Sequence, residues 1–197
     1  MAVGSRVRST GAYIHDPHTL CRRMALPQLT FNMSGPPIAP AGASSDYINL
    51  RATALAFIDA QAQDPSQPLR MKFKRIEETC TTDYEHPWGH NHAASMNPRL
   101  QGTHSFSDFT KHLEAMLPNL ESWESTVTDV LVDEARRKVM LRVSFWMEPK
   151  GPHAAVENDL LWMLEMNQDG TKVKKSTEFV DSIAAGRLKE IIMGGKA

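Results

Sequence analysis

The most regular pattern in the chain is an alternation of apolar and polar residues between Val156 and Ser182. An alternation with a period of two predicts a strand with one buried face, and a second strand follows it here. Between the strands stand Asp169 and Gly170, residue types that tolerate the positive φ of a tight turn. The pattern therefore predicts a long antiparallel hairpin. The apolar row of its first strand consists of Val156, Leu160, Trp162, Leu164 and Met166.

The rest of the pattern predicts helices in the first part of the chain and strands after them. Large side chains occupy both faces of the strand at 138–148, so we expect one face to meet the helices and the other to meet a second subunit. The predicted helices cover 46–62, 69–80 and 105–117, with one more after Ser182, and the other predicted strands cover 81–90, 122–133 and 138–148. Ser45 or Asp46 is the expected cap of the first helix, and Ser105 begins the third helix with Asp108 in the place of a capping-box acid.

Helices that are segregated from antiparallel strands define the α+β class. We expect a bent antiparallel sheet that forms a cone or barrel around the N-terminal helices, with a C-terminal helix and a pocket at its centre. Residues 1–45 are rich in Ser, Gly and Pro and predict an N-terminal arm or disordered tail. Residues 46–197 are then the folded domain.

Composition excludes several classes of partner. The chain has 197 residues and a formal net charge of −1, and no basic stripe indicates nucleic-acid binding. The longest apolar runs are too short to span a membrane, and no secretory signal is recognisable. Cys21 and Cys80 stand far apart and suggest free thiols in a reducing compartment, so we expect a cytoplasmic protein. Residues 1–45 hold four arginines and one acid, as in an organelle presequence, but lack a convincing amphipathic helix.

The densest group of polar side chains lies at 83–95, with the sequence DYEHPWGHNHAAS. His86 falls on the predicted strand, and imidazole is a good proton shuttle near neutral pH. Tyr84 and Trp88 beside it are suited to shaping an apolar pocket. His90 and His92 fall in the loop that follows, where they either contact the substrate or are simply solvated.

A metal site is the rival interpretation of the same histidines. His86, His90 and His92 could supply imidazole ligands, with Glu85 or His104 completing a zinc or iron set. The stretch lacks a carboxylate at a recognised motif spacing, so we predict no metal.

The hairpin supplies a second group of polar residues. Asn158 lies in the apolar row of the first strand, and Glu178 lies near the end of the second. An amide can orient a substrate oxygen, and a carboxyl group in an apolar pocket has a raised pKa and can act as an acid or a base. The structural alternatives are a core amide that holds neighbouring strands and a cap or salt bridge at the last helix. Trp146 and Trp162 are candidates for the pocket wall, although tryptophans more often fill a core.

Four segments carry a resemblance to a known family. They are ALAFIDA at 54–60, FTKHLEAMLPNLESWESTVTDVLVD at 109–133, ENDLLWMLEMNQDGTKVKK at 157–175 and EFVDS at 178–182. In these segments the chain resembles the SnoaL-like branch of the nuclear transport factor 2-like superfamily, and within it a group of small fungal proteins encoded beside polyketide, terpenoid and alkaloid biosynthetic genes. The resemblance covers roughly 46–190 and implies a dimeric cone with an apolar pocket on its concave side.

The family includes cofactor-free cyclases, isomerases and dehydratases, and also proteins without catalysis. We therefore expect a cofactor-independent isomerase, cyclase or dehydratase (lyase) that moves protons on an apolar polyketide- or terpenoid-derived intermediate. The alternatives are a pericyclic, Diels-Alder-type cyclase that uses pocket shape, and a non-catalytic binding or scaffold protein. The expected partners are this small molecule and a second copy of the chain.

Each candidate residue then has an expected role in that cone. His86 would be the general acid or base, with Glu178 as its counterpart, and Asn158 would orient the substrate. The residues expected to bind substrate are Tyr84, Trp88, His90, His92, Trp146 and Trp162.

Overall fold

The computed structural model describes residues 36–194 of the chain. The predicted α+β fold is confirmed. The described chain forms a six-stranded curved sheet, with helices near its start and at its end. Most of the predicted N-terminal arm lies outside the described residues, so the division of the chain near residue 45 stays a prediction. No helix among the described residues is both long and apolar enough to cross a membrane.

The predicted hairpin forms the middle of the sheet. Its strands are β5 (Val156–Met166) and β6 (Val173–Phe179), which pair antiparallel. In the turn between them Gly170 has a φ of +74°, which an L side chain rarely adopts. The Asn167 side-chain oxygen accepts backbone hydrogen bonds from Thr171 and Lys172, each at 3.0 Å. The turn is therefore fixed by the residue types that predicted it.

The sheet has the strand order β2-β1-β6-β5-β4-β3 and is not closed. Most neighbours pair antiparallel, as expected, but β1 joins β6 in parallel, which the sequence pattern did not predict. The short strand β2 was also not predicted. The four strands outside the hairpin are β1 (Cys80–Pro87), β2 (Thr103–Ser105), β3 (Leu120–Asp133) and β4 (Lys138–Pro149).

The helices begin at side-chain caps. Ser44 accepts a hydrogen bond from the Tyr47 backbone N–H and caps the first helix, one residue before the expected cap. Ser105 and Asp108 form the predicted capping box. The short helices α3, η1 and η2 were not predicted. The helices are α1 (Ser45–Asp59), α2 (Phe73–Thr79), α3 (Asn91–Ser95), η1 (Pro98–Leu100), α4 (Phe106–Met116), η2 (Leu117–Asn119) and α5 (Ser182–Gly194).

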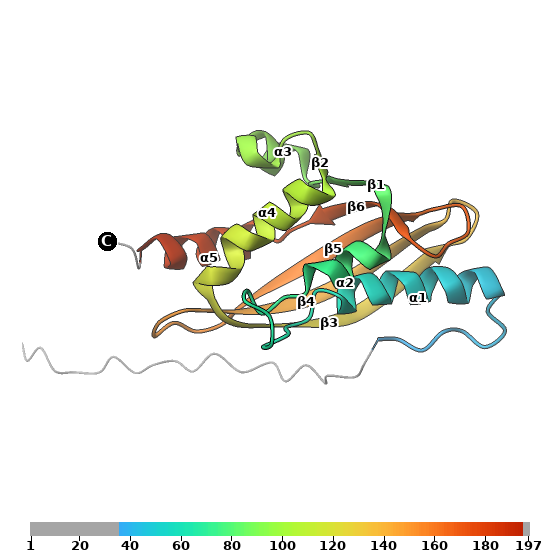
Figure 1. Ribbon diagram of the computed structural model, residues 1–197, viewed down its shortest axis with the longest axis horizontal. Helices are drawn as coiled ribbons and strands as arrows, with labels where there is room; N and C mark the ends of the chain where they lie inside the picture. The colour runs from blue at the N-terminus through green and yellow to red at the C-terminus, as the bar shows by residue number, and fades with distance from the viewer. Residues whose placement is uncertain (1–35, 195–197) are drawn as a thin grey trace, which may run out of the picture. The chain divides into compact units, whose positions relative to one another are not determined.

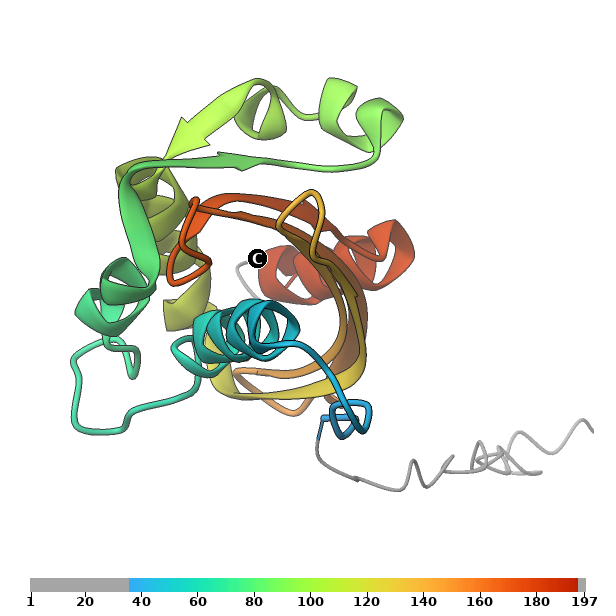
Figure 2. The ribbon, with the colours of Figure 1, turned by 90° about the vertical axis from the view of Figure 1, so that its right-hand side faces the viewer.

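The concave face of the sheet holds the core. Helix α1 lies in the hollow of the curved sheet (Figure 2), and α4 and α5 lie toward the opposite end of the sheet from α1 (Figure 1). Alternate residues of β4 separate cleanly, so that Phe145 is buried on the concave face while Trp146 is 42% exposed on the other. The sequence did not indicate which face of the strand at 138–148 meets the helices. In the structure it is the face that carries Phe145.

Candidate active site

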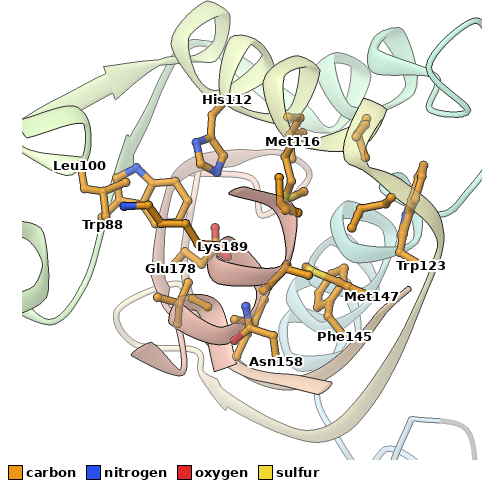
Figure 3. A pocket seen from close by; sticks show the side chains of 18 of the residues that line it. Trp88, Leu100, His112, Met116, Trp123, Phe145, Met147, Asn158, Glu178 and Lys189 are labelled. Carbon is orange, nitrogen blue, oxygen red and sulfur yellow. The ribbon is translucent and has the colours of Figure 1, made fainter. Parts of the chain in front are cut away.

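A cavity of about 430 Å³ opens between the concave face of the sheet and helices α4 and α5 (Figure 3). Its walls are mainly apolar and aromatic, as is typical of sites for small organic ligands. Strands β4, β5 and β6 form one wall, and the segment from Trp88 to Leu100 borders another side. The apolar wall includes Trp88, Leu100, Phe109, Met116, Trp123, Phe145, Met147, Leu160 and Trp162.

Glu178 is the carboxyl group of this cavity. It lies on β6 opposite Trp162 of β5, and it is 8% exposed. Burial raises the pKa of Glu178 to about 8, because the apolar surroundings disfavour the charged carboxylate. The group is therefore mostly protonated at neutral pH and can donate a proton.

The segment that directly follows β1 contacts the backbone of Glu178 and fixes its position. The Gly89 N–H donates to the Glu178 carbonyl oxygen at 2.6 Å, and Trp88 forms a parallel bridge with the same residue. A Cβ atom at Gly89 would lie 2.2 Å from the Phe179 ring, so this close approach needs glycine. The position of the carboxyl group thus depends on contacts between segments far apart in sequence.

Asn158 lines the cavity from β5 and is 7% exposed. Its Oδ1 accepts a hydrogen bond from the Asp181 backbone N–H at 3.1 Å. That bond orients the amide so that its Nδ2 donors point toward the cavity (Figure 3). Asn158 thus holds β5 to the start of α5 and also offers a hydrogen bond to a substrate oxygen.

His112 of α4 also points into the cavity, and the sequence did not single it out (Figure 3). Its pKa is lowered, first by desolvation and then by the nearby His104, although the residue is exposed by its accessible surface. The imidazole is therefore neutral at neutral pH and able to accept a proton. Its place among Phe109, Leu113 and Met116, on the apolar face of α4, is the pattern that could have revealed it.

His86 and Tyr84 form a layer behind Glu178 and are not among the residues that line the cavity. His86 is fully buried, and its Nε2 lies 3.8 Å from Glu178 Oε2. Burial lowers the pKa of His86 to about 3, with smaller contributions from His112 and His104. The catalytic role of His86 stays a prediction, but the structure gives it a contact with Glu178 and no wall of the cavity.

The other predicted substrate-binding residues divide into two groups. Trp88 and Trp162 line the cavity, as expected of a pocket wall. Trp146 lies on the opposite face of the sheet, because adjacent strand residues point in opposite directions. His90 and His92 are exposed at the start of α3. None of these three residues lines the cavity, contrary to the prediction that they bind substrate there.

The rival metal site does not assemble in the described residues. Within 36–194, no three side chains among His, Cys, Asp and Glu come together in a way that could hold a metal ion. His90 precedes α3 with a left-handed backbone, whereas His86 is buried in β1. The histidines that are close in sequence therefore diverge in space.

No family profile matches the chain. A curated relative is the austinoid biosynthesis cluster protein S of Aspergillus calidoustus, which is 30% identical over 101 residues. The match covers 47% of this chain and 68% of the relative. The chain belongs to the SnoaL-like branch of the nuclear transport factor 2-like superfamily, in its fungal secondary-metabolite group.

Solved structures agree with this SnoaL-like assignment at the level of the fold. The BvnE pinacolase of Penicillium brevicompactum superposes with a TM-score of 0.61 and 14% identity, over 76% of this chain and 98% of that one. A SnoaL-like protein from Jannaschia sp. CCS1 gives a TM-score of 0.57 and 14% identity, over 76% and 96% of the two chains. At such identities the likeness carries the fold of this SnoaL-like protein and not its reaction.

Proposed function

We propose that this SnoaL-like protein is a cofactor-independent biosynthetic enzyme that isomerises, cyclises or dehydrates an apolar polyketide- or terpenoid-derived intermediate. The observation that carries the proposal is Glu178, a carboxyl group in an apolar cavity with a pKa raised to about 8. A carboxyl group kept neutral in this way is suited to general acid catalysis.

The proposed reaction uses two groups with opposite pKa shifts. Glu178 donates its proton to a carbonyl, hydroxyl or ether oxygen of the substrate, and His112 accepts a proton from a carbon or hydroxyl of the same molecule. One bond to hydrogen forms and another breaks, and in a dehydration the C–O bond to the protonated hydroxyl also breaks and water leaves. The substrate undergoes no net oxidation or reduction, and proton exchange with water restores Glu178 and His112. The Nδ2 group of Asn158 would donate a hydrogen bond to the oxygen on which charge develops.

Within this proposal the apolar walls hold and fold the substrate. A cavity of about 430 Å³ lined by aromatic and aliphatic side chains suits a compact polycyclic molecule with few oxygen atoms. The names of the austinoid cluster protein and of the pinacolase add support for secondary-metabolite chemistry and for a rearrangement without redox change.

The direct test identifies the substrate first. The gene is deleted in a producing organism, and the accumulated compound is purified and incubated with the protein in D₂O. We expect an isomeric, cyclised or dehydrated product, with deuterium retained only where the reaction protonates a carbon. Glu178→Gln should lose turnover, whereas Glu157→Gln on the outer face should keep it.

Two results would overturn the proposal in favour of its rivals. Tight binding of the accumulated compound without turnover would favour a carrier or scaffold protein. Conversion that is unchanged in both Glu178→Gln and His112→Gln would favour a pericyclic reaction, in which the cavity only folds a reactive polyene.

We further propose that the protein is a homodimer through the outer face of its sheet. Trp146, Met140 and Leu161 are each about 40% exposed on that face, and aromatic and Met side chains are enriched at interfaces. Light scattering should give twice the chain mass of 22.0 kDa for the wild type. A folded Trp146→Glu variant should give the monomer mass, and a monomeric wild type would end this proposal.

A further inference from the structure

Behind Glu178 lies a row of buried polar groups that the proposed reaction does not use. Tyr84 Oη lies 2.5 Å from Ser176 Oγ, and Ser176 Oγ lies 2.8 Å from His86 Nδ1. His86 Nε2 lies 3.8 Å from Glu178 Oε2 and has no hydrogen-bond partner among the described residues. A buried polar atom without a partner is costly, so this nitrogen calls for an explanation.

All four side chains of the row are buried. Ser176 and His86 are fully buried, and Tyr84 and Glu178 are 4% and 8% exposed. Only Glu178 lines the cavity, so the row runs from the cavity wall into the protein interior. A substrate that meets Glu178 cannot touch the other three residues, and any effect they have on a reaction must pass through Glu178.

The directions of the hydrogen bonds follow from donor and acceptor counts. If Tyr84 donates to Ser176 Oγ and Ser176 donates to His86 Nδ1, both hydroxyl protons are used and the imidazole proton sits on Nε2. In the reverse direction His86 Nδ1–H donates toward Ser176, and Ser176 donates to Tyr84. The buried Tyr84 hydroxyl proton would then have no acceptor among the described residues, and the Nε2 lone pair would face the Glu178 oxygen. In a third arrangement Ser176 Oγ accepts from both Tyr84 and His86 Nδ1–H, and the buried Ser176 hydroxyl proton would lack an acceptor among residues 36–194. The first direction is therefore the one in which both hydroxyl protons are used.

We infer that His86 is a positioning residue whose Nε2–H is aimed at Glu178 by the hydrogen-bond row from Tyr84 through Ser176. The inference rests on the proposed function, because it describes how the proposed acid is supported. A small rotation of the Glu178 carboxyl group closes the 3.8 Å gap to a hydrogen bond. Oε1 then remains toward the cavity, where it delivers the proton.

The consequence for the reaction lies in the state after proton donation. Glu178 becomes a carboxylate in an apolar cavity, and the Nε2–H group of His86 lies 3.8 Å from its Oε2. A hydrogen bond to the charged form stabilises it and limits the cost of losing the proton. His86 itself stays neutral, because it is buried and faces His104 of β2 and His112 of α4. The other titratable group at the far end of the row is Cys80, beside Tyr84.

The position of the His86 proton can be measured without any substrate. A negative result would therefore be distinct from failure of the proposed function. Nitrogen-15 NMR of the full-length protein reports which ring nitrogen of His86 carries the proton, with His86→Gln as the assignment control. Carbon-13 NMR of the Glu178 carboxyl group gives its titration midpoint. We expect the Nε2–H form in the wild type, and a proton on Nδ1 would overturn the inference.

Variants of the row sharpen the same measurement. In Ser176→Ala the Nδ1 atom loses its donor, so we expect a mixture of ring forms and a Glu178 midpoint raised by about one pH unit. Tyr84→Phe keeps the aromatic ring and should raise the midpoint less. His86→Gln retains an N–H donor and should keep the midpoint closer to the wild type than His86→Leu does. An unchanged midpoint in folded Tyr84→Phe and His86→Leu would contradict the inference even if Ser176→Ala failed to fold.

Discussion

Polar and acidic side chains have different surroundings on the two faces of the central sheet. On the outer face Arg142 contacts both carboxylate oxygens of Asp159, and the Ser144 hydroxyl donates to Glu157 Oε1 at 2.6 Å. On the concave face Glu178 and Asn158 sit among aromatic and aliphatic side chains. The carboxylates outside have charged or hydroxyl partners and access to water, whereas Glu178 inside is buried, and burial raises its pKa.

The difference teaches that position on the sheet, and not residue type, decides what a carboxyl group can do. Asn158 and Asp159 are adjacent in β5, and the period of two sends one to the cavity and the other to an ion pair. A shift of one residue in the register would exchange their roles. The concave face is therefore where proton-transfer chemistry is expected, and the outer face is expected to contribute to solubility and assembly.

The largest expected effect separates Glu178 from Glu157. Glu178→Gln keeps the shape of the side chain but removes the acidic proton, and we expect a loss of about 10²- to 10⁴-fold in kcat. Glu157→Gln changes a carboxylate on the neighbouring strand that does not reach the cavity, so kcat should stay within about twofold of the wild type. Steady-state kinetics on the accumulated intermediate checks both variants, and equal losses would erase the distinction between the two faces.

Two leucines of β5 test the same contrast through stability. Leu164 is fully buried on the concave face, whereas Leu161 is 42% exposed on the outer face. Leu164→Ala should reduce the free energy of unfolding by about 2–5 kcal/mol, because it leaves a cavity in the core. At a chain concentration below that needed for the proposed dimer, Leu161→Ala should reduce it by less than about 1 kcal/mol. Urea unfolding of both variants at that concentration measures this, and a loss in Leu161→Ala as large as that in Leu164→Ala would contradict the contrast between the two faces.

The free energy of unfolding should depend on pH because Glu178 ionises. Its pKa is raised from 4.5 to about 8 in the folded state, so the folded protein holds this proton more tightly and stability falls as pH rises through that range. The lowered pKa values of His86 and His112 act in the opposite direction only below about pH 6.5. Between about pH 6.5 and 8 the wild type should lose up to about 2 kcal/mol.

The control for that slope is Glu178→Gln, which has no carboxyl group to ionise. Its free energy of unfolding, measured in urea at each pH, should be nearly constant across the same window. A slope equal to that of the wild type would mean that another group is responsible.

The smallest effect is expected at the ion pair of the outer face. Arg142 and Asp159 are roughly half and a third exposed, and exposed pairs contribute little because water and salt screen them. Asp159→Asn should lower the free energy of unfolding by less than about 1 kcal/mol and leave the pH slope between 6.5 and 8 intact. A loss of several kcal/mol, seen in thermal or urea unfolding, would contradict the expectation that water and salt screen this pair.

Much of the fold could be predicted from local patterns. The alternation in β5, the Asp169-Gly170 turn and the Ser105–Asp108 capping box each depend on residues within a few positions of one another. The parallel pairing of β1 with β6 could not be predicted in this way, because it joins segments about 90 residues apart. The short strand β2 has three residues and lacks a pattern long enough to detect.

The candidate site was predictable only in part, for the same reason. Asn158 and Glu178 stood out because each is polar in an otherwise apolar stretch, and both line the cavity. His86 was singled out with them, but its separation from the cavity depends on how β1 packs behind β6. His112 was missed because one histidine in an amphipathic helix is a weak pattern without knowledge of what the helix faces.

The most direct measurement is a titration of the Glu178 carboxyl group in the folded wild type. Carbon-13 NMR or isotope-edited infrared spectroscopy reports its ionisation, and Glu178→Gln identifies the resonance or band by its loss. The account predicts a midpoint near pH 8, with the group mostly protonated at neutral pH. A midpoint near the ordinary value of 4.5 would mean an ionised carboxylate in the cavity, and it would contradict the proposed acid.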